Sequence, residues 1–252
     1  MKKLVIVTGA AMVLGIAGII TAAGAWYFFI RENAELASDP PAIPAALLNA
    51  TASPTNAASA SSLTATTASK PSATVAYAVK SGLSEAAYFV DEELASVGIP
   101  STAKGSTNEI GGTLYLSGDG TALATGQPST FTVQLSNVTS DKQMRDQRVQ
   151  QALDTSRYPT ATFTITSASG YNVTIAEGQE QTMQLSGNLQ LHGVTKPVTW
   201  EVKAFRQGNV ISALATVTVK FSDFNITPPT FQGLLSISDQ AMLQVQLIAQ
   251  AA

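Results

Sequence analysis

Apolar and polar residues alternate along most of the chain from Val75 to Ala252. In one of the clearest runs, Phe131, Val133 and Leu135 are separated by single polar residues. A period of two turns one side of a β-strand toward a core and the other toward water. The other apolar positions with this period are Phe163, Ile165, Tyr171, Val173, Ile175, Met183, Leu185, Leu189, Leu191, Val198, Trp200, Val202, Ile211, Ala213, Ala215, Val217, Val219, Phe221, Ala241, Leu243, Val245 and Leu247.

Short glycine-containing segments separate these runs, at Ser117–Gly120, Ser169–Gly170, Glu177–Gly178 and Gln207–Asn209. Such segments favour tight turns between strands. Many strands with short connections are typical of an antiparallel sandwich or barrel, and the pattern by itself does not choose between the two.

One segment departs from the period of two. Ser140 to Leu153 is predicted to form a helix, with a sparse apolar stripe formed by Met144, Val149 and Leu153. Ser140 is expected to cap this helix, and Gln143 to reach back to complete a capping box.

The first thirty-one residues have a different character. Lys2 and Lys3 precede an uncharged run of 27 residues from Leu4 to Ile30, which as a helix is roughly 40 Å long and can span a bilayer with some tilt. Aromatic residues at its far end suit a membrane interface. The alternative is a cleaved signal peptide, since Thr21–Ala25 offers small residues to a peptidase. We expect residues 1–31 to be an uncleaved signal-anchor. Both interpretations export the rest of the chain.

Residues 32–74 read as a linker. From Ala50 to Thr74, 20 of 25 residues are Ala, Ser or Thr, and prolines punctuate the stretch. Such a composition buries too little apolar surface to offset its conformational entropy, which predicts a flexible, disordered segment. The predicted domain organisation is therefore an anchor (1–31), a linker (32–74) and a β domain (75–252). The expected location is the cell membrane, crossed once, with the β domain outside the cytoplasm.

Composition narrows the chemistry. The chain has no cysteine and one histidine, which excludes disulfides, thiol nucleophiles and cysteine-based zinc sites. Charged residues make up only 12% of the chain, with a net charge of -3. Nucleic-acid binding needs a concentrated basic surface, so it is not expected. No acidic cluster has the spacing of metal ligands, so neither a metal nor any other cofactor is expected.

Four segments, in this order along the chain, resemble sequence motifs of one bacterial family. They are Arg145-Asp146, Tyr158–Phe163 (YPTATF), Leu185–Val198 (LSGNLQLHGVTKPV) and Phe221–Ile226 (FSDFNI). This set is similar to the YceI family of lipid- or polyisoprenoid-binding proteins of the bacterial envelope. Asn225 stands where the family has glycine. A histidine that the family often carries near the start of the domain is absent, and so is the one after Arg145-Asp146.

The resemblance implies an all-β fold: an eight-stranded antiparallel, lipocalin-like barrel with a short helical insertion. It also implies an interior channel that holds a long isoprenoid or other apolar lipid, with no catalytic activity. We expect these apolar side chains to line that channel: Phe131, Val133, Leu135, Phe163, Ile165, Leu189, Leu191, Trp200, Val202, Val217, Val219 and Val245. The alternative is that they simply fill a closed core, in which case the domain would be a ligand-free interaction or stress-related scaffold.

The polar residues of these motifs allow structural and functional interpretations. His192 has no nucleophile-elbow pattern near it, so a structural hydrogen bond is expected instead of catalysis. Arg145 and Asp146 are expected to pair locally or to fix the helix on the barrel, with a contact to a ligand headgroup as the alternative. Asp91–Glu93 is expected to be a solvated acidic surface. The sequence does not determine the oligomeric state.

Overall fold

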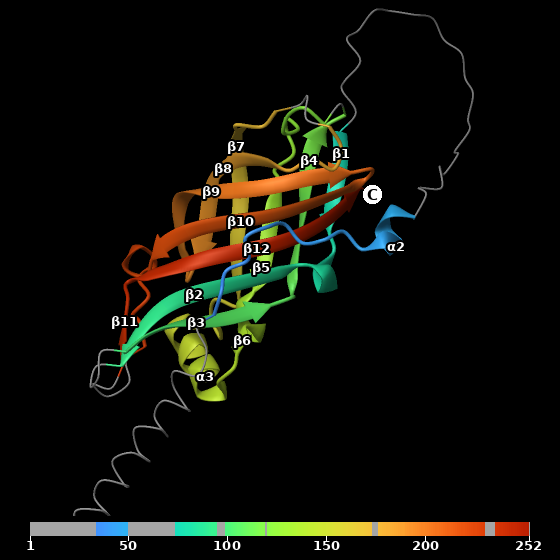
Figure 1. Cartoon of the computed structure of the whole chain (residues 1–252). Coiled ribbons are helices and arrows are strands. Elements are labelled where there is room, and N and C mark those ends of the chain that lie inside the picture. The colour runs from blue at the N-terminus through green and yellow to red at the C-terminus, as the bar shows by residue number, and fades with distance from the viewer. Residues whose placement is uncertain are drawn as a thin grey trace, which may run out of the picture.

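The computed structural model of the chain describes residues 34–49, 74–94, 99–118, 120–172, 176–229 and 235–251. These residues form one antiparallel β-barrel with a short helix at one end (Figure 1). The strands are β1 (Thr74–Val79), β2 (Glu85–Leu94), β3 (Ile99–Thr107), β4 (Ile110–Ser117), β5 (Thr130–Gln134), β6 (Thr139–Ser140), β7 (Thr160–Ser169), β8 (Gln181–Leu191), β9 (Val194–Gln207), β10 (Val210–Lys220), β11 (Leu235–Ile237) and β12 (Gln240–Ala251). The helices are α2 (Ala45–Leu48), α3 (Gln143–Ala152) and the 3-10 turns η1 (Ser81–Leu83), η2 (Leu135–Asn137) and η3 (Ser222–Phe224).

The barrel closes through its first and last strands. The strands follow one another in the order β1-β4-β5-β7-β8-β9-β10-β12, and β12 pairs back onto β1 from Tyr77↔Ala251 to Val79↔Ala249. Every pairing in this ring is antiparallel. The predicted all-β class and the closed, eight-stranded antiparallel barrel with a short helix are therefore confirmed.

Three neighbouring strands bend at a shared level. After a short break, β1 continues as β2, β3 as β4 and β5 as β6. The C-terminal end of β12 pairs with β1, and an earlier part of β12 pairs with β2. Ser84, which is only 1% exposed, satisfies the backbone at this bend. Its hydroxyl donates to the Lys80 carbonyl at 3.0 Å and accepts the Ile248 N–H at 3.0 Å. A buried hydroxyl thus replaces ladder bonds that the bend removes.

Helix α3 lies beside β6 at the end of the barrel that the bent strands form (Figure 1). It begins at Gln143, and the residue before it, Lys142, makes no side-chain capping bond. The expected capping box was therefore wrong. The Ser140 hydroxyl instead donates to the Asp146 carboxylate at 2.6 Å, and the Ser140 N–H donates to the same oxygen at 2.7 Å. Asp146, in the first turn of the helix, therefore fixes the backbone that leads into the helix.

Residues 34–49, here called the strap, lie along the outer wall of the barrel (Figure 1). Gln244 on β12 exchanges two hydrogen bonds with the Ala37 backbone, at 2.9 and 3.0 Å, and is only 3% exposed. The buried Ser212 hydroxyl on β10 donates to the Pro41 carbonyl at 2.5 Å. We expected these residues to belong to a flexible linker, and that expectation was wrong for the strap. Its backbone finds partners in side chains of the barrel.

Two predicted segments lie outside the described residues. They are the predicted anchor, residues 1–31 with the hydrophobic run Leu4–Ile30, and the remainder of the linker, residues 32–33 and 50–73. Within the part of the chain that the structure describes, no helix has the length and apolar character needed to cross a membrane.

Candidate ligand-binding cavity

The barrel encloses a cavity of about 640 Å³. Its lining extends from Glu92 and Arg145, beside α3, to Tyr171 and Arg206 near the opposite end. We call the end with Glu92 and Arg145 the α3 end. We call the level of Trp200, midway along β9, the waist. Small-molecule sites commonly have volumes of about 300–1,000 Å³ and mostly apolar walls. The interior is therefore hollow, and the alternative of a solidly filled core does not describe this barrel.

The residues predicted from the sequence to face inward come together on the cavity wall. Eleven of the twelve line it, and the exception is Val217. Val217 packs partly buried against both clusters of core side chains. The lining residues among the twelve are Phe131, Val133, Leu135, Phe163, Ile165, Leu189, Leu191, Trp200, Val202, Val219 and Val245.

Further lining residues come from positions that we did not include, some on β2 and some on β10. Tyr88 and Val90 project from β2, and Ala213 and Ala215 from β10. The period of two was visible at all four positions. The alanines contribute little volume, so they leave space that larger residues would occupy.

Glycine shapes the wall at the waist. Gly187 on β8 lies directly beneath the Phe163 ring, and a Cβ at this position would overlap that ring and the Thr164 carbonyl. Phe163 can therefore lie close to β8, next to Trp200, with their ring centroids 5.8 Å apart and the planes tilted by 59°. This is an ordinary separation for an aromatic pair.

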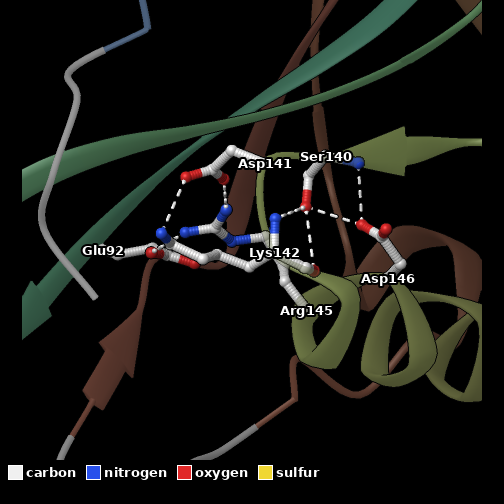
Figure 2. Close-up of polar contacts among 6 residues, drawn as sticks. All are labelled: Glu92, Ser140, Asp141, Lys142, Arg145 and Asp146. Carbon is white, nitrogen blue, oxygen red and sulfur yellow. Dashed lines mark hydrogen bonds and ion pairs between the residues drawn. The ribbon is translucent and has the colours of Figure 1, made fainter. Parts of the chain in front are cut away.

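A buried ion pair lies in the wall at the α3 end. Arg145 on α3 makes an ion pair with Glu92 on β2 at 3.3 Å and also binds Asp141, as Figure 2 shows. Glu92 is 6% exposed, whereas its neighbours Asp91 and Glu93 face solvent. The expectation that all three acidic residues are solvated was therefore wrong for Glu92. Burial raises the pKa of its carboxyl group, and the nearby Arg145 charge opposes that rise.

Arg145 pairs locally with Asp141 and also fixes the helix on the barrel, and Asp146 pairs locally, so both expected kinds of contact are present. Arg145 links α3 to β2, and Asp146 holds Ser140. Tyr88 lies near this charged group, and burial raises the pKa of its phenol, so the hydroxyl stays neutral. Since Arg145 already faces two carboxylates, it offers an incoming ligand little uncompensated positive charge.

His192 has a structural role. Together with Gly193 it forms the two-residue turn between β8 and β9, and both residues have positive φ angles, 50° and 74°. Two consecutive positive φ angles give the turn geometry that best suits a two-residue hairpin. The His192 Nδ1–H donates to the Phe224 carbonyl at 3.0 Å. The hydrogen bond expected from the sequence is present, and it ties this turn to η3.

Comparison with known proteins places this geometry in a family. The family model described as a YceI-like domain matches residues 77–249, more than half of the chain. The chain belongs to the YceI-like family. Proteins named YceI from Salmonella arizonae and Salmonella newport are 36% identical to it over 104 residues. That match covers 38% of this chain and spans half the length of each relative.

Two solved structures share the YceI-like fold seen here. BcnA of Burkholderia cenocepacia aligns with a TM-score of 0.52 and 17% identity, over 68% of this chain and 99% of BcnA. A polyisoprenoid-binding domain from Saccharophagus degradans aligns with a TM-score of 0.54 and 17% identity, over 71% of this chain and 99% of that domain. At this level of identity the comparison concerns the fold alone.

The YceI-like motifs converge in space at the α3 end. The Tyr158 ring packs edge-on against His192, with centroids 5.1 Å apart, and it also lies against Gly193. His192 in turn binds Phe224. Asn225, at the position of the family's glycine, has a φ of 55°. Asparagine tolerates this left-handed conformation better than most residues, which explains the replacement. The motif residues of this cluster therefore stabilise loops.

Proposed function

We propose that this YceI-like domain is a binding protein, not an enzyme, that holds one long apolar molecule of the isoprenoid type inside the barrel. The observation that carries the proposal is the cavity of about 640 Å³, whose mostly apolar wall extends from the α3 end to the opposite end of the barrel. Burying each CH2 group of such a ligand contributes about 0.8 kcal/mol, so a long chain binds tightly without polar contacts.

The isoprenoid class is supported by the relative from Saccharophagus degradans, a polyisoprenoid-binding domain of the same fold. The lining of the cavity agrees with this class, because a mostly apolar wall that extends from Glu92 and Arg145 to Tyr171 and Arg206 suits an apolar chain better than a compact polar metabolite. No nucleic acid is expected as a partner, given the low charge.

We also propose that residues 1–31 hold the barrel at the outer face of the cytoplasmic membrane. The position of the strap supports this proposal. The Ala34 N–H donates to the Thr102 carbonyl on β3 at 3.1 Å. Thr102 pairs with Asp91, the neighbour of Glu92, so the start of the strap lies at the α3 end. Two residues lie between Arg31 and Ala34, so the backbone between them spans at most about 10 Å. A membrane helix ending at Arg31 would therefore hold the α3 end of the cavity close to the bilayer.

That arrangement differs from the one that a free linker would give. A flexible linker of residues 32–74 would allow the barrel to move roughly 35 Å from its anchor. With the strap bound to the wall, the α3 end is the natural entrance for a lipid leaving the membrane.

The test is recovery of lipid from the intact protein. Full-length protein is purified from membranes, and native mass spectrometry is combined with solvent extraction to identify what it carries. The proposal expects a long apolar molecule in a 1:1 complex. Folded protein without extractable lipid, under several expression conditions, would contradict it.

A plugged barrel supplies the matched comparison. Ala213→Phe and Ala215→Phe together place two rings in the cavity, since both alanines line it. Thr218→Phe adds a ring at an exposed position of the same strand. The double variant should lose at least about tenfold in lipid occupancy, because each displaced CH2 removes a share of the binding free energy. The Thr218 variant should retain its lipid.

A further inference from the structure

Trp200, at the waist of the cavity, carries a polar group that is unpaired within the described segments of the chain. Trp200 is 6% exposed and lines the cavity. Its indole Nε1–H is buried and has no hydrogen-bond partner among the residues that the structure describes. An unpaired buried donor is unfavourable, and native proteins rarely keep one without a reason.

The surroundings of Trp200 explain why no protein group reaches it. Phe163 packs beside the ring, and the neighbours from β8, β9 and β10 are apolar. Other buried polar side chains of the barrel are paired: Ser84 binds backbone, Gln244 binds the strap and Glu92 binds Arg145. A phenylalanine at position 200 would cover much of the same apolar surface without the unpaired N–H.

From this geometry we infer that the Trp200 Nε1–H donates a hydrogen bond to a neutral oxygen of the bound ligand. The inference rests on the proposed function and defines the class of ligand more closely. The preferred ligands are long apolar molecules with one carbonyl, ether or hydroxyl oxygen at the waist, in preference to plain hydrocarbons. Trp200 is then a specificity-determining residue.

An anionic group does not fit this position. A carboxylate or phosphate at the waist would exchange its hydration for a single donor within an apolar wall, which is strongly unfavourable. Three cationic residues line the cavity away from the waist. Arg145 already binds Glu92 and Asp141, Arg206 near the opposite end pairs with Glu177, and Lys220 is exposed at the end of β10. The oxygen at the waist is therefore neutral.

The experiment uses two ligands that differ in one oxygen. The sequence has two tryptophans, Trp26 and Trp200, so full-length protein with Trp26→Phe reports on Trp200 fluorescence alone. This protein is freed of lipid and titrated with heptadecane and with heptadecan-9-one, its mid-chain ketone, both delivered from cyclodextrin. We expect the ketone to bind about two- to tenfold more tightly than the alkane, the net effect of one hydrogen bond.

Removing the donor should remove the preference. In a Trp26→Phe, Trp200→Phe protein, calorimetry should give equal affinities for alkane and ketone. Phe163→Leu is the matched control, because it alters the same wall without a polar group and should weaken both ligands alike. If Trp200→Phe does not fold, 3-benzothienylalanine at position 200 keeps the ring shape and lacks the N–H.

The outcomes separate the inference from the proposed function. Equal affinities in the parent protein, or a ketone preference that persists without the Nε1–H, would overturn the role of Trp200 while the apolar cavity still binds. Folded protein that binds neither molecule would overturn the proposed function itself.

Discussion

The α3 end and the waist of this cavity differ in whether their buried polar groups have partners among the described residues. At the α3 end, Glu92 and Arg145 lie on different elements and neutralise each other. At the waist, Trp200 has a buried donor with no partner in the described part of the chain. Polar groups of one cavity therefore serve different purposes: those at the α3 end hold the barrel together, whereas the one at the waist is the group that we infer binds a ligand.

The α3 end is also where the rest of the polar structure gathers. The motif contacts of Tyr158, His192 and Phe224 lie there, as does the pairing of Ser140 with Asp146. The waist, by contrast, is held by apolar packing around Phe163 and Val202. Substitutions at the α3 end should therefore affect stability, and substitutions at the waist should affect binding.

The largest effect is expected for Arg145→Met. This change leaves the Glu92 carboxylate buried and unpaired, so the free energy of unfolding should fall by about 3–5 kcal/mol. Denaturant unfolding measures it. The double variant Glu92→Gln, Arg145→Met should recover most of the loss, because it removes the uncompensated charge. If the single and double variants are equally unstable, the pair does not stabilise this end as described.

A smaller loss is expected on the outer wall, for Gln244→Ala. Its side chain satisfies both the N–H and the carbonyl of Ala37, so its removal should cost about 1–3 kcal/mol. Amide hydrogen exchange at Ala37 should become faster in the variant. Gln246→Ala, on the same strand, is the control. Unchanged exchange at Ala37 would show that other contacts hold the strap.

Titration of Glu92, at the α3 end, should make the free energy of unfolding depend on pH. Burial raises its pKa in the folded state above the ordinary value of 4.5, so the folded protein binds the proton more tightly than the unfolded chain. The stability from this group is therefore present below about pH 4.5 and is lost as the pH rises through the folded pKa, with a slope of at most about 1.4 kcal/mol per pH unit. Unfolding of wild type and Glu92→Gln across this range measures the difference. Parallel curves would contradict the prediction.

The smallest change in stability is expected at the waist. In lipid-free protein, Trp200→Phe should alter the free energy of unfolding by less than about 1 kcal/mol, because loss of apolar contact is offset by removal of the unpaired donor. Thermal and denaturant unfolding test this. A loss of about 3 kcal/mol or more would instead indicate that the indole is an essential part of the core.

Alternation along the strands was sufficient to predict most of the wall. A residue such as Leu189 faces inward because its neighbours on the same strand alternate with polar residues, and pairing keeps that orientation through the sheet. Glu92 followed the same rule, since Tyr88, Val90 and Glu92 share one parity, but its charge suggested solvent. Its partner Arg145 lies 53 residues later in the chain, and no local pattern connects the two.

The strap could not be predicted for a related reason. Its composition resembles that of a linker, and its hydrogen bonds come from barrel residues far along the chain: Gln244 is 207 residues from Ala37. The partner side chains, Gln244 and Ser212, are polar residues at positions that alternation assigns to the outer face. Only the folded barrel shows that this part of the face is covered.

Besides its hydrogen bonds to the barrel, the strap has a covalent connection to β1 through residues 50–73. While that connection is intact, the strap meets the wall at an effective concentration in the millimolar range typical of tethered segments. A single proteolytic cut between Asn49 and Thr74 would turn it into a separate peptide that binds the barrel as an ordinary ligand. Dilution would then release it, together with everything that precedes Ala34, from a barrel whose own strands are uncut.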